Sequence, residues 1–219
     1  MKVFVTGATG ATGQLIVQQL IERGTTVRAL VRDLETARKM LPATTDLVEG
    51  SILDSLAVNQ AIADCHVIIC AAGARAGIDV TGPYWVDYEG TKILVEQAQA
   101  KNIKHFVLVS SLCVSQFFHP LNLFGLILVW KKQAEEYLQK SGLTYTIVRP
   151  GGLRNDASDQ PLVMKSADQL FEGSIPRSKV AEVCIEALFS EQAKNKIVEI
   201  VCQSDAPQLS YQELFAKVG

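Results

Sequence analysis

The sequence predicts an α/β protein with a single-domain, Rossmann-type fold, in which a doubly wound, mostly parallel sheet is flanked by helices. Two observations predict this class. The chain opens with a β-branched and aromatic run, followed by the turn VTGATGATG and a segment with helical apolar spacing. Later apolar runs are nearly continuous instead of alternating, as in strands covered on both faces, and helical segments separate them.

The same periodicities place each element. Strands are expected at Lys2–Thr6, Val27–Arg32, Asp46–Gly50, His66–Gly73, His105–Ser111, Tyr145–Gly152 and Lys196–Cys202. Helices are expected at Thr12–Arg23, Leu34–Met40, Ser55–Ala63, Val86–Ala100, in a long segment ending near Ser141, and at Ser178–Ser190 and Tyr211–Val218. With 219 residues, 48% of them hydrophobic, and no linker-like composition, we expect one domain over residues 1–219. Its part from about residue 151 would supply small elements on the substrate or partner side.

The turn VTGATGATG carries a glycine at every third position, Gly7, Gly10 and Gly13. Glycine allows backbone angles closed to other residues and lets the main chain approach a pyrophosphate at a helix N-terminus. A glycine turn can also join a strand to a helix without any ligand. Because this turn follows the first strand and precedes a second strand with a charged end, we predict a dinucleotide site.

The residue after the second strand indicates which dinucleotide binds. An acid at this place bonds the ribose hydroxyl of NAD, whereas an arginine can hold a 2′-phosphate in a bidentate manner. Arg32 stands there, followed by Asp33, which could serve as the acid. We expect NADP(H), because Arg28 and Arg38 add positive charge nearby.

Composition excludes several other classes of function. A formal net charge of −2 without a basic cluster argues against nucleic acid as a partner. The cysteines and histidines are scattered at spacings unlike those of metal ligands, so no metal site is expected. The first strand follows Met1 directly and no apolar segment reaches membrane-span length, so we expect no leader and no transmembrane segment. The expected location is the cytoplasm or the chloroplast stroma.

Several motifs along the chain resemble those of the atypical short-chain dehydrogenase/reductases, with NmrA-like redox sensors as more distant kin. The residues that carry the likeness are the GxxGxxG pattern, VRALVRD, VDYEGTKILVEQA, HFVLVSS, the KxxAE of Lys131 to Glu135, and TIVRPGG. Two longer stretches, LNLFGLILVWKKQAEEYLQKSGLTYTIVRPGGL and KIVEIVCQSDAPQL, resemble the NADP-binding domain of the chloroplast inner-envelope translocon subunit that tethers ferredoxin-NADP reductase, and its cyanobacterial relatives. The Pro/Ser-rich tail of that subunit does not follow in this sequence, so reductase tethering is not carried over.

The resemblance implies roles for individual residues around NADP(H). The pyrophosphate would be held by Gly7, Thr9, Gly10, Ala11, Thr12 and Gly13, the 2′-phosphate by Arg32, and the adenine by Ser51 and Ile52. The riboses would meet Ala71, Ala72, Gly73 and Lys131, with Ser110 also at the cofactor, and the nicotinamide face would meet Pro150, Gly151, Gly152 and Leu153.

The resemblance also implies a catalytic set in which one member is replaced. Carbonyl reductases of the family use a serine, a tyrosine and a lysine, and the tyrosine delivers the proton. Ser111 and Lys131 fit the serine and lysine positions, but Ile127 stands where the tyrosine is expected. A YxxxK sequence does occur from Tyr88 to Lys92, but it lies before the fifth strand and is not assigned this role.

Two functions therefore stay open. The first is an NADP(H)-dependent oxidoreductase of low or atypical activity, with protons from Ser111, Tyr84 or solvent, or with an acceptor that needs none. The second is a non-catalytic NADP(H) redox-sensing module or assembly factor for a photosynthetic or membrane-associated partner.

The segment LNLFGLILVW, Leu121 to Trp130, bears on that choice. It is apolar on every side, yet far too short to span a bilayer. It could pack between the sheet and a neighbouring helix, or within a homodimer bundle. Alternatively it is an exposed patch near the substrate mouth that docks a protein or a membrane surface, which would place the chain at the periphery of the thylakoid membrane. Both a monomer and a homodimer stay open.

Overall fold

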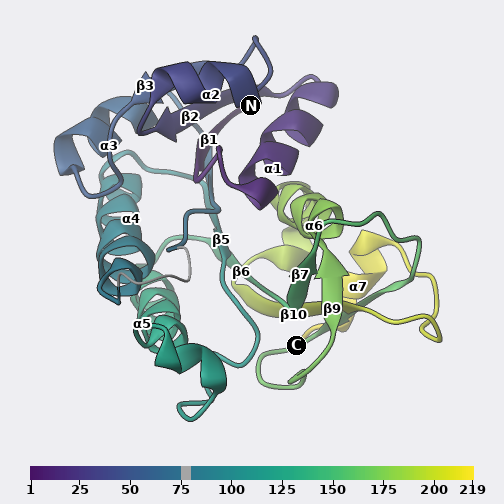
Figure 1. The fold of residues 1–219 in the computed structure, drawn as a ribbon. Helices are drawn as coiled ribbons and strands as arrows, with labels where there is room; N and C mark the ends of the chain where they lie inside the picture. Colours follow the sequence, from purple (N-terminus) through teal and green to yellow (C-terminus); the bar gives the residue numbers. More distant parts are fainter. Residues whose placement is uncertain (75–79) are drawn as a thin grey trace.

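The computed structural model describes residues 1–74 and 80–219, and its centre is an eight-stranded sheet with the order β3-β2-β1-β4-β5-β6-β10-β8 (Figure 1). The first six strands in sequence are β1 (Lys2–Thr6), β2 (Thr26–Val31), β3 (Asp46–Glu49), β4 (Val67–Cys70), β5 (His105–Val109) and β6 (Tyr145–Pro150). They pair in parallel with one another, and β6 pairs in parallel with β10 (Lys196–Cys202). The predicted Rossmann-type sheet is therefore confirmed.

Helices cover both faces of this sheet (Figure 1). They are α1 (Ala11–Glu22), α2 (Leu34–Met40), α3 (Ser55–Ile62), α4 (Gly90–Ala100), α5 (Ile127–Lys140), α6 (Arg177–Phe189) and α7 (Tyr211–Lys217). Side chains from β1 explain the continuous apolar runs, because Val3 and Val5 join the core cluster under α1 and α6, while Phe4 joins the cluster under α3, α4 and α5. Both faces of the strand are buried.

The helix predicted at Val86–Ala100 begins a few residues earlier, at Pro83. A π-helical turn, η1 (Pro83–Glu89), leads directly into α4. Predicted strands also end earlier, most clearly at β4, where the chain leaves the sheet after Cys70. Ala71 to Gly73 lie beyond the strand, at the edge where the parallel strands end.

Three short strands near the C-terminus were not predicted. β8 (Leu162–Lys165) pairs antiparallel with β10 and closes the edge of the main sheet. β7 (Gly152–Arg154) and β9 (Ser174–Pro176) form a separate two-stranded parallel pair. Strands of three or four residues show too little periodicity to be recognised in a sequence.

The segment Leu121–Trp130 is not the covered helix that was one of the alternatives. A 3₁₀ turn, η2 (Pro120–Leu123), precedes α5, and only Ile127 to Trp130 are helical. Leu123 is 83% exposed, and Phe124 and Leu126 are also exposed. In the single chain, Leu121, Leu123, Phe124 and Leu126 therefore form an exposed apolar patch, whereas Leu128 is buried. Coverage of the patch in a homodimer stays a prediction.

Within the described residues, no helix combines the length and the apolar character needed to cross a bilayer. Across the same residues, no group of three or more His, Cys, Asp or Glu side chains is arranged to hold a metal ion. The five cysteines are buried as free thiols. Burial raises the pKa of the Cys65 thiol to about 11, so it is protonated at neutral pH.

Candidate cofactor site

Two glycines of the VTGATGATG turn are required by the packing of the chain itself. Gly7 has a φ of +73°, and a Cβ there would lie 2.5 Å from backbone atoms of Ala71 and Ala72 at the end of β4. A Cβ at Gly13 would collide with the carbonyl oxygen of Gly7. These two positions bring β1, the start of α1 and the end of β4 together.

The middle glycine is restrained less by the protein. A Cβ at Gly10 would meet only the Gly7 carbonyl oxygen, at 3.2 Å, and the φ of Gly10 is an ordinary −76°. Gly10 is also the N-cap of α1 and makes no side-chain cap, and it lies on the wall of a cavity. Uncapped helix N–H groups beside an open space can receive a phosphate.

This cavity has a volume of about 410 Å³ and lies where β1, β2 and β4 end, at the point where the strand order reverses. The volume is in the range of small-molecule sites, and the place is the one where open α/β sheets bind ligands. Of the predicted cofactor residues, the lining contains Gly7, Thr9, Gly10, Arg32, Ile52, Ala71, Ala72 and Gly73.

Arg32 and Asp33, the two residues that bear on a 2′-phosphate, lie in different surroundings. Arg32 is exposed on the cavity wall, while the Asp33 carboxylate caps α2 by accepting hydrogen bonds from the Thr36 N–H at 3.1 Å and the Thr36 hydroxyl at 2.6 Å. These hydrogen bonds lower the pKa of Asp33. The candidate acid is thus engaged in a cap, and Arg32 lies at the cavity.

The supporting charges expected from Arg28 and Arg38 are not available there. Arg28 pairs with Asp46, the first residue of β3, at 2.7 Å, and with Asp64 at 2.8 Å. Arg38 pairs with Glu35 on its own helix at 3.2 Å. Both guanidinium groups are neutralised by acids outside the cavity lining, so that part of the argument for NADP(H) was wrong.

A small cleft adjoins the cavity and shares Ala72 with it. Ser110 and Lys131 line it, together with Asp87 and Thr91. The Lys131 Nζ donates to Asp87 Oδ1 at 2.7 Å, and the Asp87 side chain is only 1% exposed. Asp87 Oδ2 accepts from the N–H of Ala74, so this carboxylate joins the lysine to the loop that follows β4.

Asp87 was missed in the sequence because an acid beside Tyr88 and Glu89 is typical of a solvated helix face. Its burial arises from the π-helical turn η1, which packs against α5 and brings Asp87 opposite Lys131. The Lys131 Nζ lies near Gly73, since a Cβ on Gly73 would lie 3.6 Å from it, and the role of the lysine at a ribose stays a prediction.

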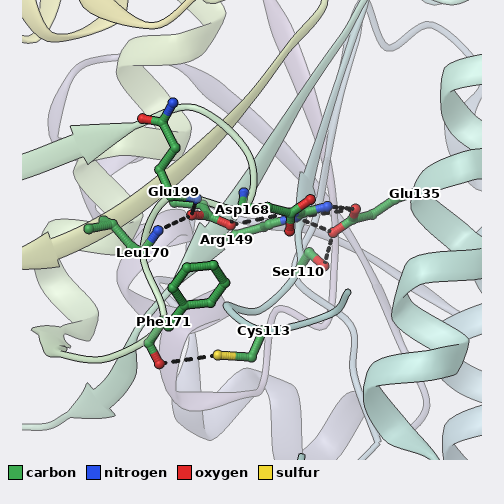
Figure 2. A network of polar contacts seen from close by, with 9 residues as sticks. Ser110, Cys113, Glu135, Arg149, Asp168, Leu170, Phe171 and Glu199 are labelled. Atoms are coloured by element: carbon green, nitrogen blue, oxygen red, sulfur yellow. Dashed lines mark hydrogen bonds and ion pairs between the residues drawn. The ribbon is translucent and has the colours of Figure 1, made fainter. Parts of the chain in front are cut away.

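Of the two serines that follow β5, Ser110 and Ser111, Ser110 is the buried one. Its hydroxyl donates to Glu135 Oε1 at 2.5 Å (Figure 2). Arg149 holds the same carboxylate through its Nη2, at 2.6 Å from Glu135 Oε2, and also contacts Glu199 at 3.1 Å and Asp168 at 3.0 Å. Arg149, Glu135 and Glu199 are completely buried. Burial opposes a charge on Arg149, but hydrogen bonds to Glu135 and Glu199 and the charges of Glu135 and Asp168 raise its pKa and keep it protonated.

This buried network also orders the loop beyond β8. Glu199 accepts from the consecutive backbone N–H groups of Asp168, Gln169 and Leu170 at 2.9, 2.9 and 2.7 Å. Figure 2 shows the same loop continuing to Phe171, whose carbonyl accepts from the Cys113 thiol at 3.2 Å. Arg149 and Glu135 lie inside the motifs TIVRPGG and KxxAE, but their pairing was not predicted.

Other predicted site residues lie outside the linings of these two spaces. Ser111 is half-buried after β5, and the Ser51 hydroxyl accepts from the Leu53 N–H at 3.2 Å. Gly151 donates its N–H to Ile200, and Gly152 and Leu153 pair within β7 and β9. The roles of these residues stay predictions, as do those of Ala11, Thr12, Gly13 and Pro150.

The position of the missing tyrosine is filled by packing. Ile127 begins α5 and packs against an apolar cluster that includes Leu112, Leu128 and Val201. The hydroxyl of Tyr84 donates to Glu89 Oε1 at 3.0 Å, and this hydrogen bond raises the pKa of Tyr84. Tyr84 is therefore a weaker acid here than a free phenol.

A parallel sheet with a glycine turn, an uncapped helix start and a cavity at the switch point defines a dinucleotide-binding protein of the Rossmann type. Residues 7–191 match the family described as NAD(P)H-binding, and the chain belongs to that family.

Curated relatives agree with the resemblance found in the motifs. The chain is 47% identical to a chloroplast protein of Arabidopsis thaliana, over 99% of this chain and 82% of the relative. It is 35% identical to protein TIC 62 of Pisum sativum, over 99% of this chain but only 46% of TIC 62. It is 33% identical to sanguinarine reductase of Eschscholzia californica, over 91% of this chain and 88% of the relative.

Solved structures agree on the fold. A protein described as an NAD-dependent epimerase/dehydratase of Bacillus halodurans superposes with a TM-score of 0.86 at 26% identity, over 99% of each chain. A short-chain dehydrogenase/reductase of Veillonella parvula, solved in complex with NADP, superposes with a TM-score of 0.76 at 19% identity, over 95% of this chain and 98% of that one. The family model, the fold and the relatives together place the chain among NAD(P)H-binding proteins of the Rossmann type.

Proposed function

We propose that this protein is an NADP(H)-dependent oxidoreductase that passes hydride to an acceptor needing no proton from a tyrosine. The observation that carries the proposal is the combination at α5: Lys131 remains at the cofactor cleft, whereas Ile127 packs into an apolar cluster where the phenol would be. NADPH, when bound, supplies the hydride.

The proton inventory of the site supports this class of acceptor. Reduction of an aldehyde or ketone to an alcohol needs a proton as the hydride arrives, and a positioned acid contributes roughly 10²- to 10⁴-fold. Ser111, the predicted proton donor, lies outside the linings of the cavity and the cleft. The Ser110 hydroxyl proton is directed at Glu135, and the Tyr84 proton at Glu89. Quinones, flavins and dyes accept hydride without such an acid in the protein.

The choice of NADP(H) over NAD(H) rests on Arg32 and Asp33. Arg32 is exposed at the cavity, and Asp33 is used as the cap of α2. A guanidinium in this place suits a 2′-phosphate, and a capping carboxylate is less available to a ribose hydroxyl. The relative named sanguinarine reductase supports a reductase role for a chain of this length.

The test is oxidation of NADPH by the purified protein with quinones, flavins and dyes, beside a panel of aldehydes and ketones. We expect turnover with the first group and slow reduction of the second. The variant Ile127→Tyr restores a phenol four residues before Lys131 and is expected to speed carbonyl reduction if the packing around residue 127 admits it. Brisk carbonyl reduction by the unmodified protein would contradict the proposal.

A second candidate is a non-catalytic module that reports the NADP(H) redox state to a partner. The same Ile127 packing favours it, and so does the exposure of Leu121–Trp130, through which a protein or a thylakoid membrane surface would be contacted from the stroma or cytoplasm. Tight NADPH binding without NADPH oxidation by any acceptor would favour this candidate over the first.

A further inference from the structure

Burial is inverted in the second half of the loop between β5 and α5. Leu112 and Val114 in the first half are buried, but the apolar side chains of the second half are exposed. They are Phe117, Phe118, Leu121, Leu123, Phe124 and Leu126, and we call this set the apolar tip. Phe118 is 96% exposed and Leu123 is 83% exposed. Single exposed hydrophobic residues are ordinary, but six within ten residues of one loop are not. Figure 1 shows this loop projecting beyond the rest of the chain below α5.

One polar residue of the same part of the loop, Asn122, lies inside. Asn122 is only 8% exposed, and its side-chain amide donates to the Phe117 carbonyl at 2.8 Å while its Oδ1 accepts from the Leu128 N–H at 2.9 Å. Backbone bonds add to this, from Phe124 to Leu121 and from Leu126 to Asn122. Several backbone groups of the tip are therefore bonded within the loop, while its apolar side chains point outward.

This is the arrangement that a lipid phase demands. Hydrocarbon offers no hydrogen bonds, so backbone groups that enter it must be satisfied internally, whereas exposed Phe and Leu side chains gain by leaving water. We propose that the apolar tip inserts into the surface of a lipid bilayer, and that the protein docks there peripherally.

The charges around the apolar tip are compatible with a lipid surface. The sequence contains no Asp or Glu between Glu96 and Glu135, so the tip and its flanks carry no carboxylate that anionic headgroups would repel. The nearest basic residues after the tip are Lys131, which is paired with Asp87, and Lys132. With so little positive charge, we infer that insertion of apolar side chains dominates and that electrostatic attraction is secondary.

The test is co-sedimentation of the whole protein with vesicles of phosphatidylcholine, with and without phosphatidylglycerol, in low and high salt. We expect binding to both, largely retained in high salt. Phe118→Asp with Leu123→Asp should lower the vesicle partition coefficient by roughly tenfold or more. Phe118→Asp alone is the milder variant if the double variant is unstable. The matched control is Leu56→Asp, because Leu56 is 75% exposed but lies on α3, away from the tip.

Three results would overturn the proposal. The unmodified protein could stay in the supernatant with both vesicles, or the double variant could bind them as the unmodified protein does. Analytical ultracentrifugation could instead show a dimer that the double variant abolishes, without vesicle binding, which would assign the tip to a second copy of the chain. Vesicle binding is measured without cofactor, so its outcome is independent of NADP(H) turnover.

Discussion

The two ends of the candidate cofactor site differ in the groups that form them, backbone at the glycine turn and charged side chains at the cleft. The glycine-turn end is made of backbone: Gly7 and Gly13 let β1, α1 and β4 approach one another, and Gly10 lies on an open cavity wall. At the cleft end, charged side chains are already paired: Lys131 with Asp87 in the lining of the cleft, and Arg149 with Glu135 buried behind the lining residue Ser110. The first end is shaped for a ligand by the absence of side chains. At the second, side chains from distant elements hold one another in place.

The largest expected effect comes from breaking the buried pairing at the cleft end. Arg149→Met leaves Glu135 and Glu199 buried without a cationic partner, and we expect a loss of about 3 to 5 kcal/mol in the free energy of unfolding. Arg23→Met is the control, because Arg23 pairs with Glu186 in partial exposure and should cost about 0.5 kcal/mol. Urea unfolding of both variants measures the difference, and equal losses would show that the buried network adds no more stability than a partly exposed ion pair.

At the glycine-turn end, two neighbouring glycines should respond differently to the same change. Gly7→Ala combines a left-handed φ with a collision against the end of β4, so we expect a loss of about 3 kcal/mol. Gly10→Ala meets one tight contact, 3.2 Å from the Gly7 carbonyl oxygen, at an ordinary φ, and should cost less than about 1 kcal/mol in stability. Its NADPH affinity should nevertheless fall, as read by calorimetric titration. Unchanged affinity in Gly10→Ala would remove the ligand-based reason for that glycine.

The next effect concerns affinity alone. The unmodified protein should bind NADPH more tightly than NADH, and Arg32→Ala should cost about 2 kcal/mol in NADPH binding while leaving NADH binding unchanged. Arg38→Ala is the matched control, because Arg38 is exposed nearby but pairs with Glu35. Calorimetric titration of both cofactors decides the matter. Equal affinities for NADPH and NADH before any substitution would end the case for a 2′-phosphate site at Arg32.

The smallest expected effect tests whether the two ends communicate through Asp87. Asp87→Asn keeps an acceptor for the Ala74 N–H but removes the charge that holds Lys131, so NADPH should bind roughly tenfold more weakly, about 1.4 kcal/mol. Glu96→Gln is the control, since Glu96 accepts a hydrogen bond from Tyr137 on the outer side of α4 and α5. Amide hydrogen exchange at Ala74 adds a readout that does not need the cofactor. Identical affinities in the two variants would make Asp87 structural only.

Local pattern was enough to predict the parallel sheet and the glycine turn. Strands buried on both faces must be apolar throughout, and a turn that cannot accommodate a Cβ must contain glycine. Each requirement therefore determines residues that are neighbours in the sequence. Eight of the predicted cofactor residues line the cavity. They could be predicted because they follow parallel strands, which all end at one edge of the sheet.

The pairings across the fold could not be predicted in this way. Asp87 and Lys131 are 44 residues apart, and Arg149 and Glu199 are 50 apart, so their contacts depend on how η1, α5, β6 and β10 pack. Likewise, the apolar run Leu121–Trp130 has the composition of a core, and only the tertiary structure decided that much of it faces outward. Burying a run of apolar residues is favourable, but whether protein covers the run depends on how the rest of the chain packs around it.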